Sequence, residues 1–426
     1  MTIERILSAK GVVTDSREVK RGDLFCALKG ERVDGHEYVA EAAANGASAA
    51  LVERRVDVEI EQLVVDDVLA VLQEAAQAKL AGMSAKVIAI TGSVGKTTTR
   101  TFLTTLLADH RRIHAARKNR NSQVGLPLSI LEAEGDEEIL VLEMGMTGPG
   151  EIRRLCEIAP PDIAVVTNVA LVHVGFFQDG IEGIAKAKAE IFEQAKVGIA
   201  PLDSPFSRLL METGECPKRS YSTRSREADF FGRVDGQRVQ IFEGGNPVVE
   251  CDWHVPLRHC LHNLLAAAAA ARAVGLGWRQ IEEGISKLDL PAQRFEVLER
   301  NGITIVDDTY NACTLSVCAA LDSMPEPQEG GRRIAVFGGI TELGDLTNDA
   351  HRQVAEHALG RVDHLICLGE HLAPVWEVWH REGRDIKWCM ERDELADYLS
   401  EVVQVGDVVL VKGSRIYAME EFVEVL

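Results

Sequence analysis

The sequence lacks three features, and each absence argues against a class of protein. Its longest apolar run, residues 264–271, is far shorter than the roughly 20 residues that a membrane-spanning helix needs. Its nine cysteines are odd in number and include no Cys-x-x-Cys pair, which argues against a disulfide framework or a structural zinc site. Positive charge is scarce, because 66 acidic residues outnumber 46 basic ones. The resulting net charge of −20 disfavours a nucleic-acid partner.

What the chain does contain is typical of a globular cytoplasmic protein. It is 46% hydrophobic and 26% charged, and its 426 residues suggest roughly three domains. The first residues carry no apolar signal core and the scattered cysteines are typical of reduced thiols. We therefore expect a cytoplasmic protein that is not embedded in a membrane and that acts as a monomer. Because the whole chain is acidic, a site for an anionic substrate must gather its positive charge locally.

Residues 87–99 have the pattern of a phosphate-binding loop. Residues 87–90 are apolar and β-branched and predict a buried strand, residues 91–95 predict a tight glycine loop, and a helical pattern starts at Thr97. The N–H groups of such a loop and of the helix start behind it point at anionic oxygens. Lys96 would reach the terminal phosphates, and the Thr97 hydroxyl would bind Mg²⁺. The residues expected to hold the phosphates of a nucleotide cofactor are Gly92, Ser93, Val94, Gly95, Lys96, Thr97 and Thr98.

The spacing of the two glycines distinguishes this loop from the usual one. Only Ser93 and Val94 separate Gly92 from Gly95, whereas the usual phosphate-binding loop has four residues between its glycines. Read alone, the stretch could be a chance glycine turn between a strand and a helix. The Lys-Thr-Thr sequence in register favours the phosphate loop. The short loop resembles that of the Mur ligase superfamily, whose members use ATP to join amino acids or peptides to a carboxylate.

Residues 82–297 are predicted to form a central domain around this loop. They alternate between strand and helix patterns. The apolar runs 139–142 and 163–166 join 87–90 in a predicted parallel sheet, where ligands bind at the carboxyl ends of the strands. Glu143 directly follows one run, and a carboxylate beside a phosphate loop is a candidate Mg²⁺ ligand. The alternative is an ordinary acidic residue at a strand end.

The resemblance singles out two further residues of this domain. His173 follows Asn168-Val-Ala-Leu-Val and matches an Asn-x-Ala-x2-His element of the family. This implies a ligand of a second Mg²⁺, although a lone histidine is more often structural. Lys188 stands four residues before Phe192, where the family has a lysine carbamylated by CO₂, and this implies a carboxylate-like metal ligand. Lys186 points about 200° away from Lys188 on a helix, so the two cannot share one role; the alternative is two surface lysines.

Residues 1–81 are predicted to form a small N-terminal α/β domain. An Asp-Ser-Arg pattern that contains Ser16 and Arg17, followed by Asp-Gly-His, resembles the N-terminal domain of peptide-adding family members. The resemblance implies that these residues lie where the UDP end of a UDP-muramoyl-peptide binds, although solvated turn residues have the same pattern. The alanine-rich stretch 39–50 is expected to be helical, with Gly46 as its end.

A second substrate contact is expected from the segment 119–127, which resembles the family element Asn-x-Asn-Asn-x-Ile-Gly-x-Pro. The match implies substrate contacts from Asn119 and Asn121. Lys118 and Arg120 would supply local positive charge for a phosphate or a carboxylate; a solvated charge pair is the alternative.

Residues 298–426 are predicted to form a third, Rossmann-like domain. Apolar runs separated by helical patterns predict its strands at 303–306, 334–337, 365–368 and 408–411. Residues 307–312 resemble an Asp-Asp-Ser-Tyr-Asn-Ala element of the D-alanyl-D-alanine-adding family members, and residues 342–344 and 411–415 also resemble them. This implies a domain that binds the incoming amine, with substrate contacts from Asp307, Tyr310, Asn311, Lys412, Ser414 and Arg415.

By the same resemblance, three more residues complete the expected ATP site. Asn263 is implied at the adenine end, Asp308 at the ribose and Arg294 at the γ-phosphate. The chain also departs from the family pattern, which marks a divergent member; the departures are Ser122, Leu257, Cys260, Cys313 and Gly339.

The resemblance covers nearly the whole chain and implies an α/β enzyme with a specific activity. This is an ATP- and Mg²⁺-dependent ligase that adds D-alanyl-D-alanine to UDP-N-acetylmuramoyl-tripeptide through an acyl phosphate, in cytoplasmic peptidoglycan precursor synthesis. The catalytic residues would be Lys96, His173, Lys188 and Arg294.

Three other activities are compatible with parts of this pattern. One is a family member that adds another amino acid, such as meso-diaminopimelate, whose Asp-Asn-Pro-Arg signature is absent here. Another is a P-loop switch protein, which would need an Asn-Lys-x-Asp element that is also absent. The third is a non-catalytic homologue, against which Lys96, Glu143, His173 and Lys188 argue.

Overall fold

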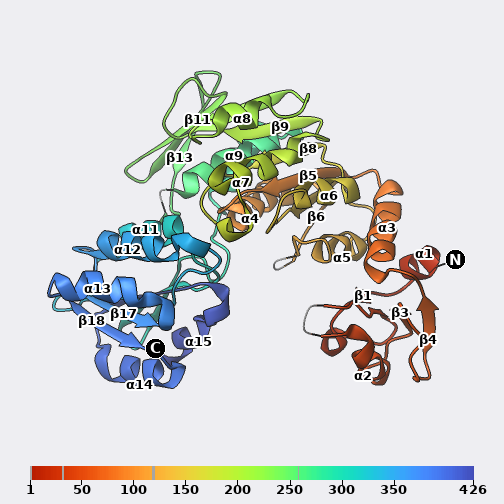
Figure 1. The fold of residues 1–426 in the computed structure, drawn as a ribbon. Helices are drawn as coiled ribbons and strands as arrows, with labels where there is room; N and C mark the ends of the chain where they lie inside the picture. Colours follow the sequence, from red (N-terminus) through yellow and green to blue (C-terminus); the bar gives the residue numbers. More distant parts are fainter. Residues whose placement is uncertain (1, 31–32, 118–119, 258) are drawn as a thin grey trace.

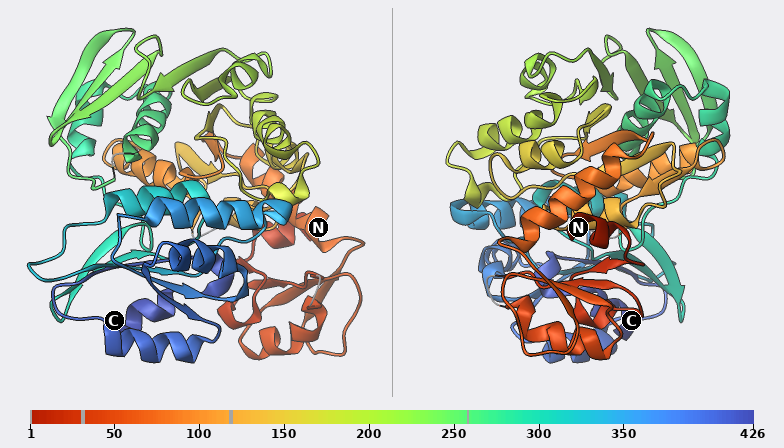
Figure 2. Two further views of the ribbon diagram at one scale, coloured as in Figure 1. Left: turned by 60° about the vertical axis from the view of Figure 1, so that its left-hand side comes forward. Right: turned by 90° about the vertical axis from the view of Figure 1, so that its right-hand side faces the viewer.

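The structure is a computed structural model that describes residues 2–30, 33–117, 120–257 and 259–426. Within these residues the chain forms three successive α/β units, each built on its own sheet, and the predicted fold class is confirmed. Figure 1 shows the central unit above the other two, with the N-terminal unit in red and the C-terminal unit in blue on opposite sides below it. Figure 2 shows the same arrangement from two further sides.

The N-terminal unit is built on a parallel sheet in the order β1-β2-β3-β4. Side chains alternate between its faces: Leu51 packs in a core with helices α1 and α3, and Val52 in a core with α2. The elements are α1 (Thr2–Leu7), β1 (Val12–Val13), η1 (Ser16–Glu18), β2 (Leu24–Cys26), η2 (Gly35–Tyr38), α2 (Val39–Ala44), β3 (Ala49–Val52), β4 (Glu61–Val64) and α3 (Val68–Ala81).

The predicted helix over 39–50 is only half right. Helix α2 ends at Ala44, and Gly46 with φ of 103° turns the chain, as predicted. Residues from Ala49 onward form strand β3, which pairs with both β2 and β4 and is fully buried. Alanine favours a helix only by a few tenths of a kcal/mol per residue, so the central position in a sheet decides the conformation here.

The central unit is built on a sheet in the order β13-β12-β11-β10-β9-β8-β5-β7-β6. Its elements are β5 (Lys86–Thr91), α4 (Lys96–Ala108), β6 (Ile113–Ala115), α5 (Gly125–Glu132), β7 (Ile139–Glu143), α6 (Glu151–Ile158), β8 (Ile163–Val166), η3 (Val174–Phe176), α7 (Gly180–Ala189), η4 (Glu190–Phe192), β9 (Val197–Pro201), α8 (Ser207–Glu212), β10 (Lys218–Ser222), β11 (Phe230–Asp235), β12 (Arg238–Glu243), β13 (Asn246–Asp252), α9 (Cys260–Ala273) and α10 (Trp278–Ile285).

The three predicted strands 87–90, 139–142 and 163–166 are neighbours in this sheet. Strand β5 lies between β7 and β8, and all three run parallel. Their carboxyl ends therefore meet at one edge, from which α4 leaves. The apolar run 264–271 is the buried centre of α9. No helix in the described part of the chain is both long and apolar enough to cross a membrane.

The prediction of alternating strands and helices is wrong at β11, β12 and β13. These strands follow one another as antiparallel hairpins without an intervening helix. The turns contain Asp235-Gly236 and Gly244-Gly245, and all three glycines have positive φ. Such dipeptides are strong hairpin signals, so the sequence did carry the information.

The C-terminal unit is built on a sheet in the order β14-β15-β19-β16-β17-β18, in which only the pair β14–β15 is antiparallel. The four predicted strands are β15, β16, β17 and β19. Strand β14 begins two residues before the predicted domain start at 298. The elements are β14 (Glu296–Arg300), β15 (Ile303–Asp308), α11 (Thr314–Ser323), β16 (Arg333–Phe337), η5 (Gly344–Leu346), α12 (Thr347–Ala358), β17 (His364–Leu368), η6 (Glu370–Leu372), α13 (Ala373–Arg381), β18 (Asp385–Cys389), α14 (Arg392–Val402), β19 (Val408–Lys412), η7 (Arg415–Tyr417) and α15 (Glu420–Val425).

Candidate active site

The loop between β5 and α4 is shaped by two glycines. Gly92 has φ of 151° and Gly95 has φ of 85°. A Cβ at Gly92 would overlap the Thr167 side chain, and one at Gly95 would overlap Asn263. The Thr167 hydroxyl also donates to the Val94 carbonyl at 2.6 Å. The loop is thus held in place by β8 and α9, which orients its N–H groups before a ligand binds.

Lys96 begins helix α4 and folds back over the loop. Its ammonium donates to the Gly92 carbonyl at 2.7 Å. Burial lowers the pKa of Lys96; the Glu143 carboxylate opposes this shift and the Arg294 charge adds to it. A phosphate oxygen that accepted a hydrogen bond from this ammonium would replace the neutral Gly92 carbonyl. A hydrogen bond between two charged groups is stronger than one to a neutral carbonyl.

Glu143, at the end of β7, faces the start of α4. The Thr97 hydroxyl donates to Glu143 Oε2 at 3.2 Å, and Arg100 Nε lies 3.3 Å from Oε1. The carboxylate is 2% exposed, and its Oε1 accepts no hydrogen bond from any described residue.

This pair of oxygen groups fits Mg²⁺, which favours oxygen ligands and usually keeps water and phosphate oxygens in its shell. No three His, Cys, Asp or Glu side chains of the described residues lie close enough together to hold a metal ion by themselves. A cation here would therefore share its ligands with the phosphates.

His173 follows β8 and lies 27% exposed in the same cavity. Its φ of 59° is left-handed, and its ring contacts Glu342 of the C-terminal unit. Burial lowers the pKa of His173, the Glu342 carboxylate opposes this, and the charges of Lys96 and Lys188 act in the same direction as burial. His173, Lys96 and Lys188 line the same cavity.

The two lysines of α7 lie in opposite environments, as the helical spacing predicts. Lys186 is 59% exposed and donates to Asp179 at 3.1 Å. Lys188 is 4% exposed, and none of the described residues accepts a hydrogen bond from its amine. Burial and then the charge of Lys96 lower the pKa of Lys188 well below its usual value. A buried lysine with a strongly lowered pKa beside a phosphate loop is unusual and indicates a functional site.

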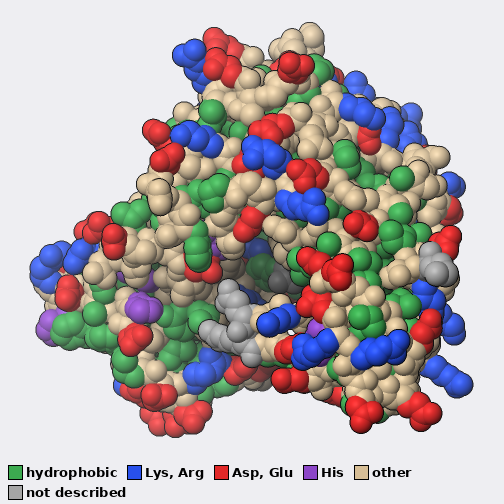
Figure 3. Space-filling view, turned by 45° about the vertical axis from the view of Figure 1, so that its right-hand side comes forward, with side chains coloured by type: hydrophobic (Ala, Val, Ile, Leu, Met, Phe, Trp, Pro, Cys, Tyr) green, Lys and Arg blue, Asp and Glu red, His purple; other side chains and the backbone are tan. Residues whose placement is uncertain are grey.

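Two cavities meet at the loop. The larger, of about 970 Å³, contains Lys96, Glu143, His173 and Lys188. The smaller, of about 500 Å³, is lined by α9 and the ends of β8, β9 and β10. Val94, Gly95, Thr98, Arg294 and Ser316 line both. Figure 3 shows a hollow in the middle of the molecular face between the units. The arrangement suits a nucleotide whose phosphates lie in the larger cavity and whose nucleoside lies in the smaller.

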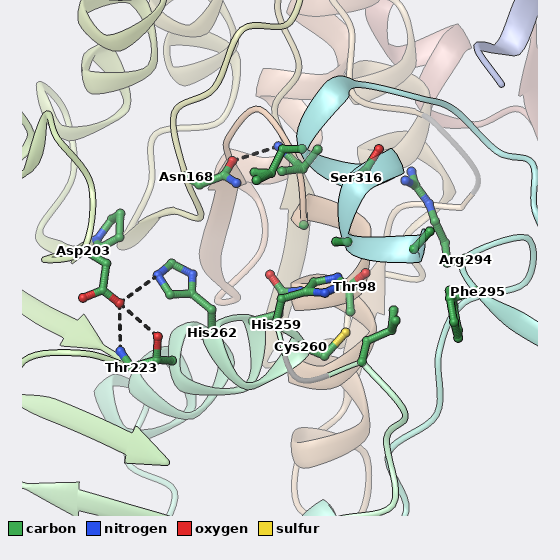
Figure 4. A pocket seen from close by; sticks show the side chains of 18 of the residues that line it. Thr98, Asn168, Asp203, Thr223, His259, Cys260, His262, Arg294, Phe295 and Ser316 are labelled. Atoms are coloured by element: carbon green, nitrogen blue, oxygen red, sulfur yellow. Dashed lines mark hydrogen bonds and ion pairs between the residues drawn. The ribbon is translucent and has the colours of Figure 1, made fainter. Parts of the chain in front are cut away.

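The smaller cavity contains polar residues that the sequence analysis missed. His262 lies 3.8 Å from Asp203, which also accepts from the Thr223 N–H at 2.8 Å. Figure 4 shows this cluster at one end of the cavity and Arg294 at the other. Burial lowers the pKa of His262 to about 4. Asp203 and Thr223 follow strands β9 and β10, so the general rule that ligands bind at strand ends could have identified them.

Asn263, the predicted adenine contact, lines the smaller cavity but lies close to the loop. The Thr99 hydroxyl donates to its Oδ1 at 3.4 Å, and its side chain packs against Gly95. Next to it, Cys260 is buried, which raises the pKa of its thiol to about 12. The substituted residue therefore presents a neutral thiol to this cavity.

Arg294 lies between the two cavities. Its guanidinium is 4.1 Å from the centre of the Tyr310 ring, and its buried Nε donates to none of the described residues. An unpaired buried donor costs free energy unless a ligand accepts from it. This position fits an anionic group between the cavities.

Asp308 and Lys412 form a buried pair at the ends of neighbouring strands β15 and β19. Lys412 Nζ donates to Asp308 Oδ2 at 2.6 Å and to the Asn311 carbonyl at 3.0 Å. Both residues line the smaller cavity. The Lys412 ammonium thus donates to acceptors of the protein itself. These hydrogen bonds hold Asp308 and the loop that follows it in place.

The other predicted substrate residues of the C-terminal unit separate into two groups. Tyr310, Asn311 and Arg415 line the larger cavity. Asp307 and Ser414 are not among the described residues that line either cavity. Asp307 accepts from the Thr309 hydroxyl at 2.6 Å and Ser414 Oγ from the Thr341 N–H at 3.0 Å. Both are buried and stabilise loops, so the predicted direct contact does not fit their geometry.

The predicted residues at the N-terminal side lie apart from this centre. Ser16 is buried, and Arg17 pairs with Asp15 at 2.6 Å. Neither belongs to the described lining of the two cavities.

The predicted substrate loop is only partly described. Asn121 lines the larger cavity, and Arg120 pairs with Glu132 at 2.5 Å. Asn119 and Lys118 lie outside the described residues, as does position 258 beside the α9 motif.

The fold and the loop define a class of protein: a nucleotide-binding enzyme of three α/β units, whose phosphate loop faces cavities lined by described residues of the central and C-terminal units. Family models agree with this class along the chain. They match the Mur ligase catalytic domain at residues 8–90, the middle domain at 90–271 and the glutamate ligase domain at 293–415.

Individual proteins give the same result. The UDP-N-acetylmuramoyl-tripeptide–D-alanyl-D-alanine ligase of Bacillus subtilis is 35% identical, over 97% of this chain and 92% of its own. A crystal structure of MurF from Acinetobacter baumannii is 29% identical with a TM-score of 0.85, over 98% of this chain and 93% of that one. MurF ligase from Thermotoga maritima in complex with ADP is 30% identical with a TM-score of 0.82, over 98% and 97%. The chain belongs to the Mur ligase family, and it is an ATP-dependent ligase that forms a carbon–nitrogen bond.

Proposed function

We propose that this chain joins the terminal carboxylate of UDP-N-acetylmuramoyl-tripeptide to the amine of D-alanyl-D-alanine. The observation that carries the proposal is the 35% identity, over 97% of the chain, to a protein named for this activity. The two connected cavities support it, because they offer separate room for a nucleoside and for reacting groups beside its phosphates.

The reaction has two steps. The tripeptide carboxylate attacks the γ-phosphorus of ATP, and ADP leaves, which gives an acyl phosphate. The dipeptide amine then attacks the acyl carbon, phosphate leaves and the amine loses its proton. A free carboxylate is a poor electrophile, and phosphorylation provides the leaving group. Lys96 and Arg294 stabilise charge on the transferring phosphoryl group, because both cationic groups line the larger cavity.

Mg²⁺ is part of the proposal. Bound Mg²⁺ would neutralise charge on the phosphate oxygens. Thr97 and Glu143 would hold one Mg²⁺ and His173 a second, and Lys188 in carbamylated form would join the metal site. The buried Lys188 amine is suited to this modification because its lowered pKa favours the neutral form that adds CO₂. The added carboxylate would replace a buried amine with an oxygen ligand.

The three predicted domains divide the substrates in this proposal. Residues 1–81 bind the UDP end through Ser16 and Arg17, residues 82–297 bind ATP, and residues 298–426 bind the incoming amine. Asp308 contacts the ribose and Asn263 the adenine end, while Asn119 and Asn121 contact the muramoyl-peptide. We also propose that the protein acts as a cytoplasmic monomer.

Phosphate release from ATP tests the activity. Purified protein is incubated with Mg²⁺, UDP-N-acetylmuramoyl-tripeptide and one amine from a panel of D-alanyl-D-alanine, meso-diaminopimelate, lysine and glutamate. We expect release that depends on the tripeptide and is fastest with D-alanyl-D-alanine. Faster release with diaminopimelate would assign the chain to the ligases that add that amino acid, and no release with any amine would favour a non-catalytic homologue.

A further inference from the structure

A glutamate of the C-terminal unit reaches His173 of the central unit. Glu342 belongs to the segment 342–344 that resembles the family, and the proposed mechanism does not use it. Its Oε2 contacts Nδ1 of His173, although the two residues are 169 positions apart in the sequence. The contact therefore exists only when the two units lie against each other.

The backbone on both sides of this contact is closely fitted. The Gly175 N–H donates to the Glu342 carbonyl at 3.4 Å, and a Cβ on Gly344 would lie 3.4 Å from the Gly175 Cα. His173 has φ of 59° and Glu342 has φ of 62°. This left-handed conformation is unfavourable for a glutamate and persists only where the surroundings hold it, which is common at functional sites.

Glu342 contacts His173 from outside the described lining of the larger cavity. His173 lines the larger cavity together with Lys96 and Lys188. Glu342 is not among the described residues lining that cavity, and it lines a separate depression with Thr341 and His371. Because Glu342 occupies Nδ1, the ring nitrogen that is left for a ligand in the larger cavity is Nε2.

A carboxylate in this position has a well-defined chemical effect. A histidine that binds a metal through one nitrogen usually donates its other N–H to a carboxylate, which fixes the ring orientation and the tautomer. We propose that Glu342 is a positioning residue that holds His173 with Nε2 directed at the Mg²⁺ and terminal phosphates of bound ATP. The inference rests on the proposed function, in which His173 is a metal ligand.

This arrangement couples docking of the C-terminal unit to metal binding. The glutamate that orients the histidine and the loops that bind the amine belong to the same unit. A complete metal site therefore forms only when that unit is docked, which restricts phosphoryl transfer to the assembled enzyme. If Glu342 only held the two units together, its loss would weaken binding of the nucleotide equally with and without metal.

Metal affinity, measured apart from turnover, tests the proposal. Full-length protein with a non-hydrolysable ATP analogue is titrated with Mn²⁺, and free Mn²⁺ is followed by its electron paramagnetic resonance signal. We expect Glu342→Ala to weaken Mn²⁺ binding about 10- to 100-fold, the usual effect of losing such a partner. Glu342→Gln keeps an acceptor for the N–H and should recover most of the affinity. Glu356→Ala removes an exposed carboxylate from α12 of the same unit and should change nothing.

A double-mutant cycle distinguishes a Glu342 that orients His173 from a Glu342 that only holds the two units together. In a His173→Ala background, Glu342→Ala should cause no further loss of Mn²⁺ affinity, and it should leave metal-free binding of the analogue unchanged. Unchanged Mn²⁺ affinity in Glu342→Ala, an equal loss in the His173→Ala background, or an equal loss of metal-free nucleotide binding would each overturn the inference. The Mn²⁺ titration contains no amine substrate. If the wild type failed to use D-alanyl-D-alanine in the phosphate-release assay, the proposed substrate would be refuted, but the titration would still test the role of Glu342.

Discussion

Replacing Lys96 by alanine should abolish ligation and leave the fold unchanged. The ammonium donates to one protein acceptor, the Gly92 carbonyl at 2.7 Å. That bond contributes about 1 kcal/mol to folding, and its loss is offset because burial disfavours the charged amine. We therefore expect a change of less than about 1 kcal/mol in the free energy of unfolding.

The effect on catalysis should be much larger. In the proposed mechanism Lys96 is a preoriented cation at the position where phosphoryl charge develops, and loss of one such donor costs at least ~10²-fold in rate. At about 1.4 kcal/mol per factor of ten, this is roughly 3 kcal/mol of transition-state stabilisation. The expected loss of transition-state stabilisation is therefore clearly larger than the expected change in the free energy of unfolding, and the two can be measured separately.

Phosphate release with all substrates present measures the first quantity, and thermal unfolding followed by circular dichroism measures the second. Lys186→Ala is the matched control, because it removes an exposed lysine that pairs only with Asp179 among the described residues. Near-normal turnover of a folded Lys96→Ala protein would remove the loop from the mechanism.

Three further substitutions have expected outcomes, two at the active site and one at the Arg332–Asp407 pair of the C-terminal unit. Lys188→Ala should be nearly inactive and partly rescued by small carboxylic acids, with Lys186→Ala close to wild type; full activity of Lys188→Ala in CO₂-depleted buffer would contradict the carbamate. Gly95→Ala should weaken ADP binding at least about 10-fold in a calorimetric titration. Gly95 has a φ of 85°, and the Cβ of an alanine there would overlap a side chain of α9. Unchanged affinity would show that the loop adapts to the alanine. Burial raises the pKa of Asp407, but the hydrogen bonds from Arg332 outweigh this and lower it below 3.8. The stabilisation by this pair should therefore be complete above about pH 4 and be lost as the pH falls through the lowered pKa. Asp407→Asn should cost roughly 2 kcal/mol in urea unfolding at pH 7, because Arg332 is 32% exposed, and an equal cost at pH 2 would refute the assignment.

Local patterns in the sequence predicted the elements whose residues interact with near neighbours. The strand–loop–helix from β5 to α4 needs glycines and Lys96 within a few positions, so spacing alone identified it. The four apolar runs of the C-terminal unit became strands for the same reason. The opposite environments of Lys186 and Lys188 followed from helix periodicity alone.

Local patterns were insufficient where sheet pairing or distant partners decide. Residues from Ala49 onward are strand because β2 and β4 lie on both sides of them. The motif around Asp307 did not reveal that its carboxylate would be used by Thr309. The ends of strands β9 and β10 point to Asp203 and Thr223, but no local pattern brings His262 of α9 to them.

The sequence by itself determined the phosphate loop, the α/β class and the family, because these depend on residue types at short, ordered spacings. Tertiary structure alone decided which of the predicted residues share a cavity and which support loops. It also placed Glu342 against His173, 169 positions away. The physical reason is that a side chain's partner across a unit boundary is set by the packing of whole sheets and helices, and the spacing of residues along the chain carries no record of that contact.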